Sequence, residues 1–241
     1  MWGALARADR GDRAFATSPV RLAGKHLVAD HSGALWWPAE RMLIVADLHL
    51  EKGSAHAVRG LMLPPYDTRD TLARLTSVVE AYAPRTVVAL GDSLHDRGAA
   101  ARLRKADRQM VHRLQLGRTW VWITGNHDPE IASFLGGEVM SGLGASGLEL
   151  RHEPQPARGS HEIAGHLHPA ARLTTRAQIV RRRCFVADGS RIVLPAFGTF
   201  AGGLNILDSA FEPLLEAADR RVWMLGDDGI YPVPPGRLVA D

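Results

Sequence analysis

The segment RMLIVADLHL, residues 41–50, runs from apolar residues into a polar tip that contains Asp47 and His49. A short apolar run that is rich in β-branched residues predicts a buried strand. Residues two apart on an extended segment point to the same side of it, so Asp47 and His49 are expected to face one site. The segment therefore predicts a strand whose end presents a carboxylate and an imidazole together.

Two similar units follow along the chain. In each, an amphipathic helix precedes an apolar strand that ends in a glycine and polar residues. The expected elements are a helix at 67–82 with Asp67 as its N-cap, a strand at 85–90, a helix at 99–116, a strand at 119–124 and a short helix at 129–135. The polar tips are Gly91-Asp92 and the GNHD sequence at 125–128. Parallel strands place such tips at their carboxyl ends, where α/β proteins build their sites.

The second half of the chain predicts mostly strands. They are expected at 148–152, 162–164, 184–187 and 191–196, with a final hairpin of 222–225 and 230–233. A βαβαβ half followed by a β half predicts the α/β (α+β) class, as a four-layer α-β-β-α sandwich of two mixed β-sheets flanked by helices. We expect a single domain over residues 1–241, with its core at about 41–205 and the C-terminal hairpin at about 221–234.

The composition indicates a chain with a large core and no membrane span. Of the 241 residues, 46% are hydrophobic, and no apolar run reaches the length that crosses a bilayer. Residues 1–19 lack the apolar stretch of a signal peptide, and the one cysteine, Cys184, can form no internal disulfide. These features predict a cytoplasmic protein. The net charge of +3 and the pI of about 9.4 favour a phosphate-bearing partner.

Residue types that bind metals recur in five short segments in a fixed order. These are D-x-H at 47–49, GD at 91–92, GNHD at 125–128, His152 and GHLH at 165–168. They supply seven candidate ligands and one further histidine, which is enough for two metal ions and a catalytic acid. His166 and His168 repeat the spacing of Asp47 and His49. A mixed set of carboxylate, amide and imidazole ligands suits Mn²⁺, Fe or Zn²⁺ better than Ca²⁺ or Mg²⁺.

This ordered set resembles the calcineurin-like metallophosphoesterase superfamily over roughly residues 41–200. The resemblance implies one metal ion held by Asp47, His49 and His168, a second held by Asn126, His152 and His166, a bridging Asp92, and a catalytic His127 that binds no metal. His161 competes with His152 for its place, because no motif surrounds His152. Asp128 either orients the His127 ring or caps the helix expected from Pro129.

Such a centre suits phosphate chemistry. The charge of two divalent cations exceeds that of the carboxylates of Asp47 and Asp92, so the site attracts a phosphate anion. Two metals about 3.5–4 Å apart can clamp a phosphoryl group and acidify a bridging water. We therefore expect in-line attack on phosphorus by metal-bound hydroxide, with His127 protonating the leaving oxygen or stabilising the developing charge.

Five further motifs indicate one branch of this superfamily. LHLEKGS at 48–54, RG at 59–60, LPP at 63–65, LPAFGTF at 194–200 and GGLN at 202–205 are similar to the PdeM-type branch, the ligase-associated DNA-damage-response endonucleases of bacteria. That branch implies a Mn²⁺-dependent phosphodiesterase or endonuclease that acts on DNA in repair, in functional association with a DNA ligase or helicase. The same metal site would also serve a phosphodiesterase for a small cyclic nucleotide or dinucleotide. A non-catalytic scaffold is a third interpretation, although scaffolds with this fold tend to lose ligands or the catalytic histidine.

Several other residues have two interpretations. Lys52 and Arg59 either contact phosphate or are solvated loop charges. The three arginines at 181–183 either touch a nucleic-acid backbone or form a solvated strand edge. Trp120 and Trp122 share one face of the expected strand, which favours core packing over base stacking.

Overall fold

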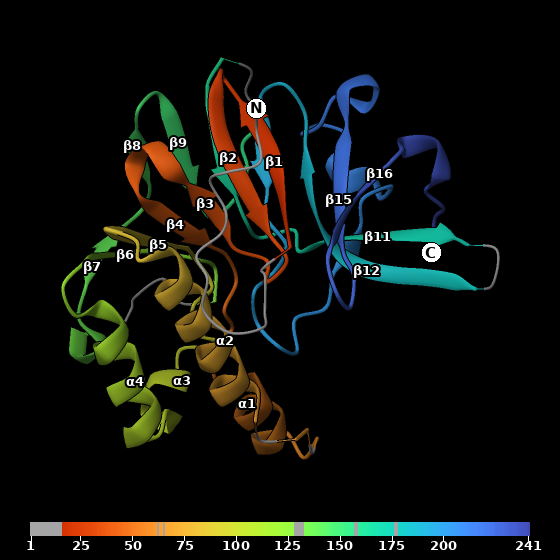
Figure 1. Cartoon of the computed structure of the whole chain (residues 1–241). Helices are drawn as coiled ribbons and strands as arrows, with labels where there is room; N and C mark the ends of the chain where they lie inside the picture. The colour runs from red at the N-terminus through yellow and green to blue at the C-terminus, as the bar shows by residue number, and fades with distance from the viewer. Residues whose placement is uncertain (1–15, 62, 65, 128–132, 157–158, 176–177) are drawn as a thin grey trace.

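The computed structural model describes residues 16–61, 63–64, 66–127, 133–156, 159–175 and 178–241. Two mixed β-sheets pack face to face, and helices lie outside them (Figure 1). This architecture confirms the predicted fold class. Among the described residues, no helix combines the length and the apolar character that crossing a membrane requires.

The first sheet runs in the order β1 to β7. Its strands are β1 (Thr17–Leu22), β2 (Lys25–Asp30), β3 (Leu35–Trp37), β4 (Met42–Val45), β5 (Thr86–Leu90), β6 (Thr119–Ile123) and β7 (Glu138–Met140). Neighbours pair antiparallel from β1 to β4 and parallel from β4 to β7. The carboxyl ends of β4, β5 and β6 therefore reach the same edge of the sheet, as the sequence predicts.

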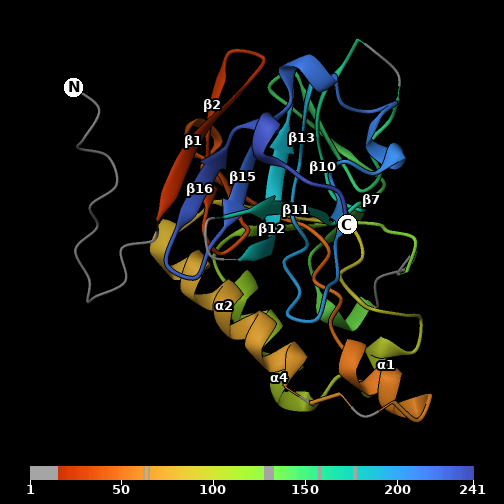
Figure 2. The same ribbon diagram turned by 90° about the vertical axis from the view of Figure 1, so that its right-hand side faces the viewer.

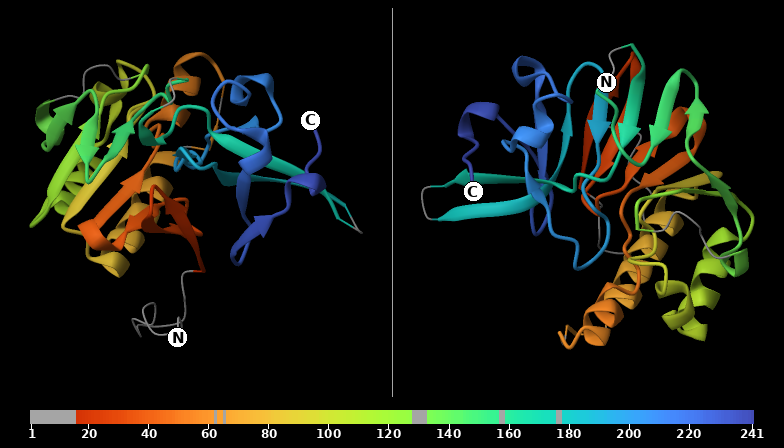
Figure 3. Two further views of the ribbon diagram at one scale, coloured as in Figure 1. Left: turned by 90° about the horizontal axis from the view of Figure 1, so that it is seen from above. Right: turned by 180° about the vertical axis from the view of Figure 1, so that it is seen from behind.

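The α-helices gather on one side of the molecule, outside the first sheet (Figures 2 and 3). They are α1 (Lys52–Val58), α2 (Asp67–Tyr82), α3 (Ala99–Arg102) and α4 (Lys105–Gln115). Leu75 of α2 and Val111 of α4 share one buried cluster with Trp120 and Trp122 of β6. The burial of both tryptophans confirms their predicted role in the core.

The second sheet carries a long hairpin that projects from the body of the molecule (Figure 1). Its strands run in the order β14 (Leu204–Asn205), β11 (Pro169–Thr174), β12 (Ile179–Ala187), β13 (Arg191–Val193), β10 (His161–Ala164), β9 (Leu148–Arg151) and β8 (Leu143–Ala145). The predicted C-terminal hairpin, β15 (Arg221–Leu225) and β16 (Ile230–Val233), pairs with β12. The projecting hairpin is formed by β11 and β12, and β12 begins well before the predicted residue 184.

Apolar side chains fill the space between the two sheets, and a further apolar cluster covers the outer face of the second sheet. Trp37, Ile44 and Phe185 belong to the cluster between the sheets. On the outer face, Phe211 and Leu215 from the segment 206–220 are buried against the second sheet. The helices in this segment are short 3-10 turns, η3 (Ser209–Phe211) and η4 (Ala217–Asp219). The second sheet is therefore covered on this face by short 3-10 turns and loops, where the prediction expected flanking helices. Three other 3-10 turns are η1 (Pro38–Glu40), η2 (Ser133–Leu135) and η5 (Pro235–Arg237).

The helix predicted over residues 99–116 is wrong, because α3 and α4 are separated at Leu103 and Arg104. The ψ angles of these two residues are 120° and 152°, which is extended backbone. Arg108 Nε donates a hydrogen bond to the carbonyl oxygen of Leu103 at 2.9 Å, and Arg104 pairs with Asp107 in the first turn of α4. Arg108 thus satisfies one backbone carbonyl at the break, and the Arg104–Asp107 pair links two side chains across the start of α4.

The predicted N-cap of α2 is also wrong. Tyr66 occupies that position, and Asp67 is the first helical residue. Asp67 Oδ2 instead accepts a hydrogen bond from the backbone nitrogen of Gly53 at 2.9 Å, which ties α2 to α1. The carboxylate still lies at the positive end of the α2 dipole. Of the short helix expected at 129–135, residues 133–135 form η2 and the others lie outside the described residues.

Candidate metal centre

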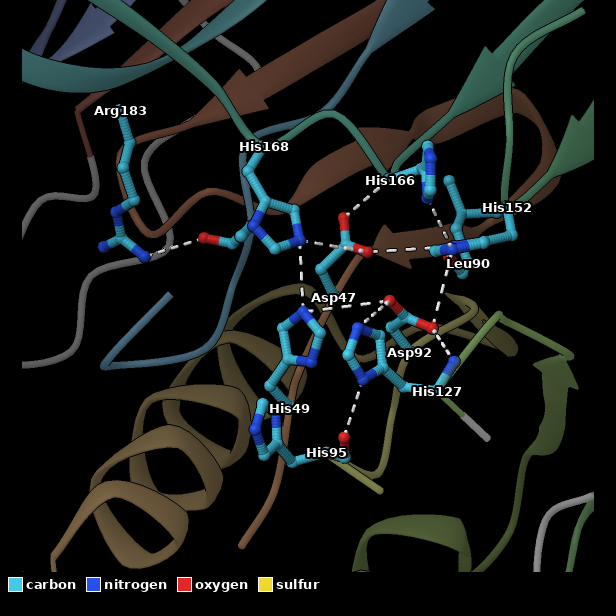
Figure 4. Close-up of polar contacts among 11 residues, drawn as sticks. Asp47, His49, Leu90, Asp92, His95, His127, His152, His166, His168 and Arg183 are labelled. Atoms are coloured by element: carbon cyan, nitrogen blue, oxygen red, sulfur yellow. Dashed lines mark hydrogen bonds and ion pairs between the residues drawn. The ribbon is translucent and has the colours of Figure 1, made fainter. Parts of the chain in front are cut away.

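Two groups of ligand-type side chains meet where the two sheets bring their strand ends together (Figure 4). The first sheet supplies Asp47 after β4, Asp92 after β5, and Asn126 and His127 after β6. The second sheet supplies His152 after β9, and His166 and His168 between β10 and β11. Segments that are far apart in sequence thus converge on one site.

The first group consists of Asp47, His49 and His168, whose ligand atoms all lie within 4.8 Å of one another. The Nε2 atoms of His49 and His168 are 3.1 Å apart, and His168 Nε2 is 3.5 Å from Asp47 Oδ1. Asp47 Oδ1 is buried, and no described residue forms a hydrogen bond with it. A buried carboxylate oxygen that lacks a donor is costly, and a cation among these three side chains would remove that cost. Burial, and next the neighbouring His168, lower the pKa of His49 to about 2, so its ring is neutral and able to bind a metal.

The second group consists of Asp92, His152 and His166, again with ligand atoms within 4.8 Å of one another. His152 Nδ1 donates a hydrogen bond to the carbonyl oxygen of Leu90 at 2.9 Å. This leaves His152 Nε2 as the ring nitrogen that faces the other two side chains, 3.5 Å from Asp92 Oδ1 and 3.1 Å from His166 Nδ1. A backbone carbonyl that fixes the tautomer of a histidine in this way is typical of metal sites. The competing His161 is exposed at the start of β10 and belongs to neither group.

Asp92 links the two groups. Its Oδ1 faces His152 as described, and its Oδ2 lies 3.9 Å from His49 Nε2. Asp92 Oδ1 also accepts a hydrogen bond from the backbone nitrogen of His127 at 2.9 Å. One carboxylate thus contacts both groups and fixes the segment that carries the predicted catalytic histidine.

His127 is exposed beside the two groups. Its Nδ1 lies 2.8 Å from the carbonyl oxygen of His95, and its ring stacks on the His95 ring at 5.4 Å between centroids. Because a carbonyl only accepts hydrogen bonds, Nδ1 carries a proton. Nε2, which is 3.9 Å from Asp92 Oδ2, is left as the nitrogen that can exchange a proton with a substrate.

Asn126 is exposed and lines a hollow of about 540 Å³ together with His152. Asp128, predicted to orient His127 or to cap a helix, lies outside the described residues. Lys52, predicted either to contact phosphate or to be a solvated loop charge, is not in a loop but is the first residue of α1. It is partly buried, and its positive charge adds to burial in lowering the pKa of His49 and of His95, the latter to about 4.

The backbone of the centre corrects one sequence expectation. Five of the residues gathered here have positive φ angles: Asp47 (54°), His49 (43°), Asp92 (45°), His166 (70°) and His168 (46°). Asp47 and His49 therefore share a site through left-handed backbone, and not because they lie on an extended strand, which ends at Val45. Such conformations are uncommon outside glycine and cluster at functional sites.

The comparisons with known proteins agree with this geometry. A model of the family described as calcineurin-like phosphoesterase matches residues 40–194, more than half of the chain. The chain belongs to this family. As a calcineurin-like phosphoesterase it is a hydrolase, and each of its two groups of Asp and His residues could hold a metal ion, an arrangement typical of dinuclear family members.

One of the solved structures that are similar to this chain is a nuclease. The nuclease MPE of Pseudomonas putida is 29% identical, with a TM-score of 0.68, and the match covers 90% of this chain and 100% of that one. A phosphoesterase from E. coli, Yfce, is 14% identical with a TM-score of 0.38, over 83% of this chain and 96% of its own. A protein of unknown function from Aquifex aeolicus is 16% identical with a TM-score of 0.37, over 57% and 81%. No curated protein matches the chain.

A glycine at the centre gives a test of its packing. Gly91 has a φ of +74°, and a Cβ there would lie 2.4 Å from His152 Nδ1. Gly117 has a φ of +73° with nothing within 4 Å of such a Cβ, so it is a matched control for the backbone strain alone. We expect Gly117→Ala to lower the free energy of unfolding by about 1 kcal/mol, and Gly91→Ala by roughly 3 kcal/mol or more. Equal losses in urea unfolding would show that His152 does not pack against Gly91.

The histidines of the centre predict how stability depends on pH. Burial is the main cause that lowers the pKa of His49, His95 and His166 below the ordinary 6.5. The unfolded chain therefore binds protons that the folded chain does not, and stability falls as the pH drops below about 6.5. We expect the Tm of the chelated protein to be lower at pH 5 than at pH 7.5. A Tm that is unchanged or higher at pH 5 would contradict the buried, neutral state of these rings.

Proposed function

We propose that this phosphoesterase is a dinuclear-metal phosphodiesterase that cleaves DNA. The observation that carries the proposal is the meeting of two metal-binding groups at Asp92, with His127 beside them. The likeness to the Pseudomonas putida nuclease over nine-tenths of the chain supports a nucleic-acid substrate. The resemblance of the motifs at 48–54 and 194–205 supports a role in DNA repair, in association with a DNA ligase or helicase.

The proposed metal ligands are the residues of the two groups together with Asn126. Asp47, His49 and His168 would hold one cation, and Asp92 would contact both. His152 and His166 would hold the other cation, together with Asn126, which lines the same hollow as His152. The mixed oxygen and nitrogen donors favour Mn²⁺, with Fe or Zn²⁺ as alternatives. When bound, two such cations polarise a phosphate ester and make a nearby water more acidic.

His127 would act on the leaving group. The His95 carbonyl oxygen keeps the Nδ1 proton in place, so only Nε2 gains and loses a proton during turnover. The exposed ring can reach an ester oxygen that leaves from a phosphate at the centre. Nε2–H would donate its proton to that oxygen as the P–O bond breaks.

The choice of His152 over His161 is tested by a matched pair of variants. We expect His152→Ala to lose at least one of two bound Mn²⁺ ions, because its Nε2 faces Asp92 and His166. His161→Ala removes an exposed histidine nearby in sequence and should keep both ions. Metal content after dialysis, measured by mass spectrometry, distinguishes them. Loss of metal in the His161 variant alone would reverse the assignment.

The proposed function is tested by hydrolysis of bis-p-nitrophenyl phosphate and of single- and double-stranded DNA, with Mn²⁺ added back after chelation. Metal-dependent cleavage of both kinds of substrate supports a nuclease. Cleavage of the small diester with DNA left intact would overturn the DNA assignment in favour of a small-molecule phosphodiesterase. Cleavage of neither would overturn the enzymatic proposal and favour a scaffold.

A further inference from the structure

A second hollow, of about 1010 Å³, is lined in part by residues that neighbour His168 of the metal centre. Ala170, which lines this hollow, is two residues after His168. Gly203 also lines it, and the next residue, Leu204, donates its backbone N–H to the carbonyl oxygen of His168. In the view of Figure 4, His168 lies between Arg183, another lining residue, and His152. The smaller hollow, in contrast, is lined by two residues of the centre itself, His152 and Asn126.

Arginines from two distant elements line this larger hollow, which we call the arginine groove. They are Arg74 of α2 and Arg181, Arg182 and Arg183 of β12. Two acidic residues, Asp227 and Asp228, line it as well. The groove therefore carries an excess of positive charge next to a site that is built for phosphate.

Arg74 and Arg183 form the partly buried floor of the groove. Arg183 Nη1 donates hydrogen bonds to the carbonyl oxygens of Ala196 at 2.7 Å and Gly198 at 3.2 Å. Arg74 donates to the carbonyl oxygen of Phe197, and its Nε is buried without a partner. Within the described part of the chain, neither guanidinium forms an ion pair with a carboxylate.

This floor places two like charges close together. Burial, and next the charge of Arg183, lower the pKa of Arg74 to about 10. The carboxylate of Asp70, one turn earlier on α2, acts in the opposite direction and raises the pKa of Arg74. It forms no ion pair with either guanidinium within the described residues, so an anion that binds beside the two cations would stabilise them further. The two positive charges of the floor thus favour a ligand that is itself negative.

The rim of the groove differs from its floor. Arg181 and Arg182 are exposed, and they pair with Asp241 and Asp227. Exposed ion pairs contribute little to stability, so these arginines can exchange their partners for phosphates at small cost. Their guanidinium groups match the geometry of phosphate oxygens.

The groove and the metal centre share one backbone segment. Gly198, whose carbonyl oxygen binds Arg183, donates its own N–H to the carbonyl oxygen of Asp47 at 3.0 Å. The neighbouring Phe197, whose carbonyl oxygen binds Arg74, donates its N–H to Ala46 at 2.8 Å. The position of the arginines is therefore fixed relative to Asp47.

We propose that the arginine groove binds the sugar-phosphate backbone of the DNA strand beyond the phosphate that is cleaved. The inference rests on the proposed nuclease function. A strand held at the centre by one phosphate carries further phosphates at regular spacing, and four arginines on one side of the centre would neutralise them. Of the four groove arginines, the sequence alone suggested such a role for residues 181–183 and not for Arg74, which lies in a helix without a motif.

The test removes the two rim charges, whose side chains are exposed, so that the substitutions leave the fold intact. The double variant Arg181→Gln/Arg182→Gln is compared with Arg113→Gln, an exposed arginine of α4 outside the groove. Fluorescence anisotropy of a labelled 20-nucleotide single strand, measured after chelation, gives Kd at several salt concentrations. We expect the double variant to bind roughly tenfold more weakly at low salt, with a salt slope smaller by about 1.4, since each single-strand contact contributes about 0.7. Arg113→Gln should bind as the wild type does.

A second variant and a second readout complete the test. Asp227→Asn removes an exposed negative charge from the groove and should tighten DNA binding. In the presence of Mn²⁺, the double arginine variant should lower the ratio of kcat/KM for DNA to kcat/KM for bis-p-nitrophenyl phosphate. If the wild type cleaves DNA and the double variant matches it in Kd, salt slope and this ratio, the groove proposal is overturned while the nuclease function stands. If the wild type cleaves the small diester but neither binds nor cleaves DNA, both proposals fail.

Discussion

Asp92→Asn is expected to abolish phosphodiester hydrolysis and the binding of the second metal ion. Asp92 is 3% exposed, and its two oxygens face His152 and His49, one in each metal-binding group. Asparagine keeps the shape of the side chain but removes the negative charge and leaves one oxygen. We expect the Mn²⁺ content to fall from about two to one or fewer per chain, and kcat for bis-p-nitrophenyl phosphate to fall by at least about 10³-fold.

Asp219→Asn is the control for this variant, because Asp219 is an exposed carboxylate in η4. It should keep both metals and full activity. Circular dichroism of both variants checks that each retains its fold. An Asp92 variant that keeps two metals and more than a tenth of the activity would show that Asp92 does not link the two groups.

His127→Ala is expected to lower kcat while both metals stay bound. The side chain contacts the His95 carbonyl oxygen through Nδ1 and leaves Nε2 free beside Asp92. General acid catalysis contributes about 10²–10⁴-fold, and it matters most for a poor leaving group. We therefore expect a larger loss with DNA, which releases an alkoxide, than with bis-p-nitrophenyl phosphate, which releases a stable phenolate.

This dependence on the leaving group separates proton donation from a structural role. His112→Ala is the control, since His112 is an exposed histidine of α4. If His127→Ala lost activity equally on both substrates, or lost metal, the side chain would act in holding the centre and not as an acid.

The parallel core of the fold could be predicted because its sequence signals are local. In β4, β5 and β6, apolar β-branched runs end in glycines or ligand residues, and burial of these strands on both faces suits such runs. The strands β1 and β2 were not predicted, although they form a regular antiparallel pair. Ala23 and Gly24, which connect them, have φ angles of 48° and 73°. An alanine in this conformation is an unusual turn residue, so the sequence gives only a weak hairpin signal there.

The identity of the candidate ligands could be read from the order of the motifs, but their geometry could not. The left-handed backbone at Asp47 and His166 depends on contacts between the two sheets, such as the hydrogen bond from the His166 nitrogen to Asp47 Oδ2 at 3.0 Å. Gly165 is required at this contact, because a Cβ there would lie 2.7 Å from the same oxygen. Arg74 was missed for a similar reason, since its neighbour Arg183 is more than one hundred residues away in sequence.

Anomalous diffraction from crystals soaked in Mn²⁺ tests the central claim most directly. The geometry predicts two anomalous peaks, one among Asp47, His49 and His168 and one among Asp92, His152 and His166, with Asp92 in contact with both. A single peak, or peaks away from these side chains, would contradict a dinuclear centre at this position.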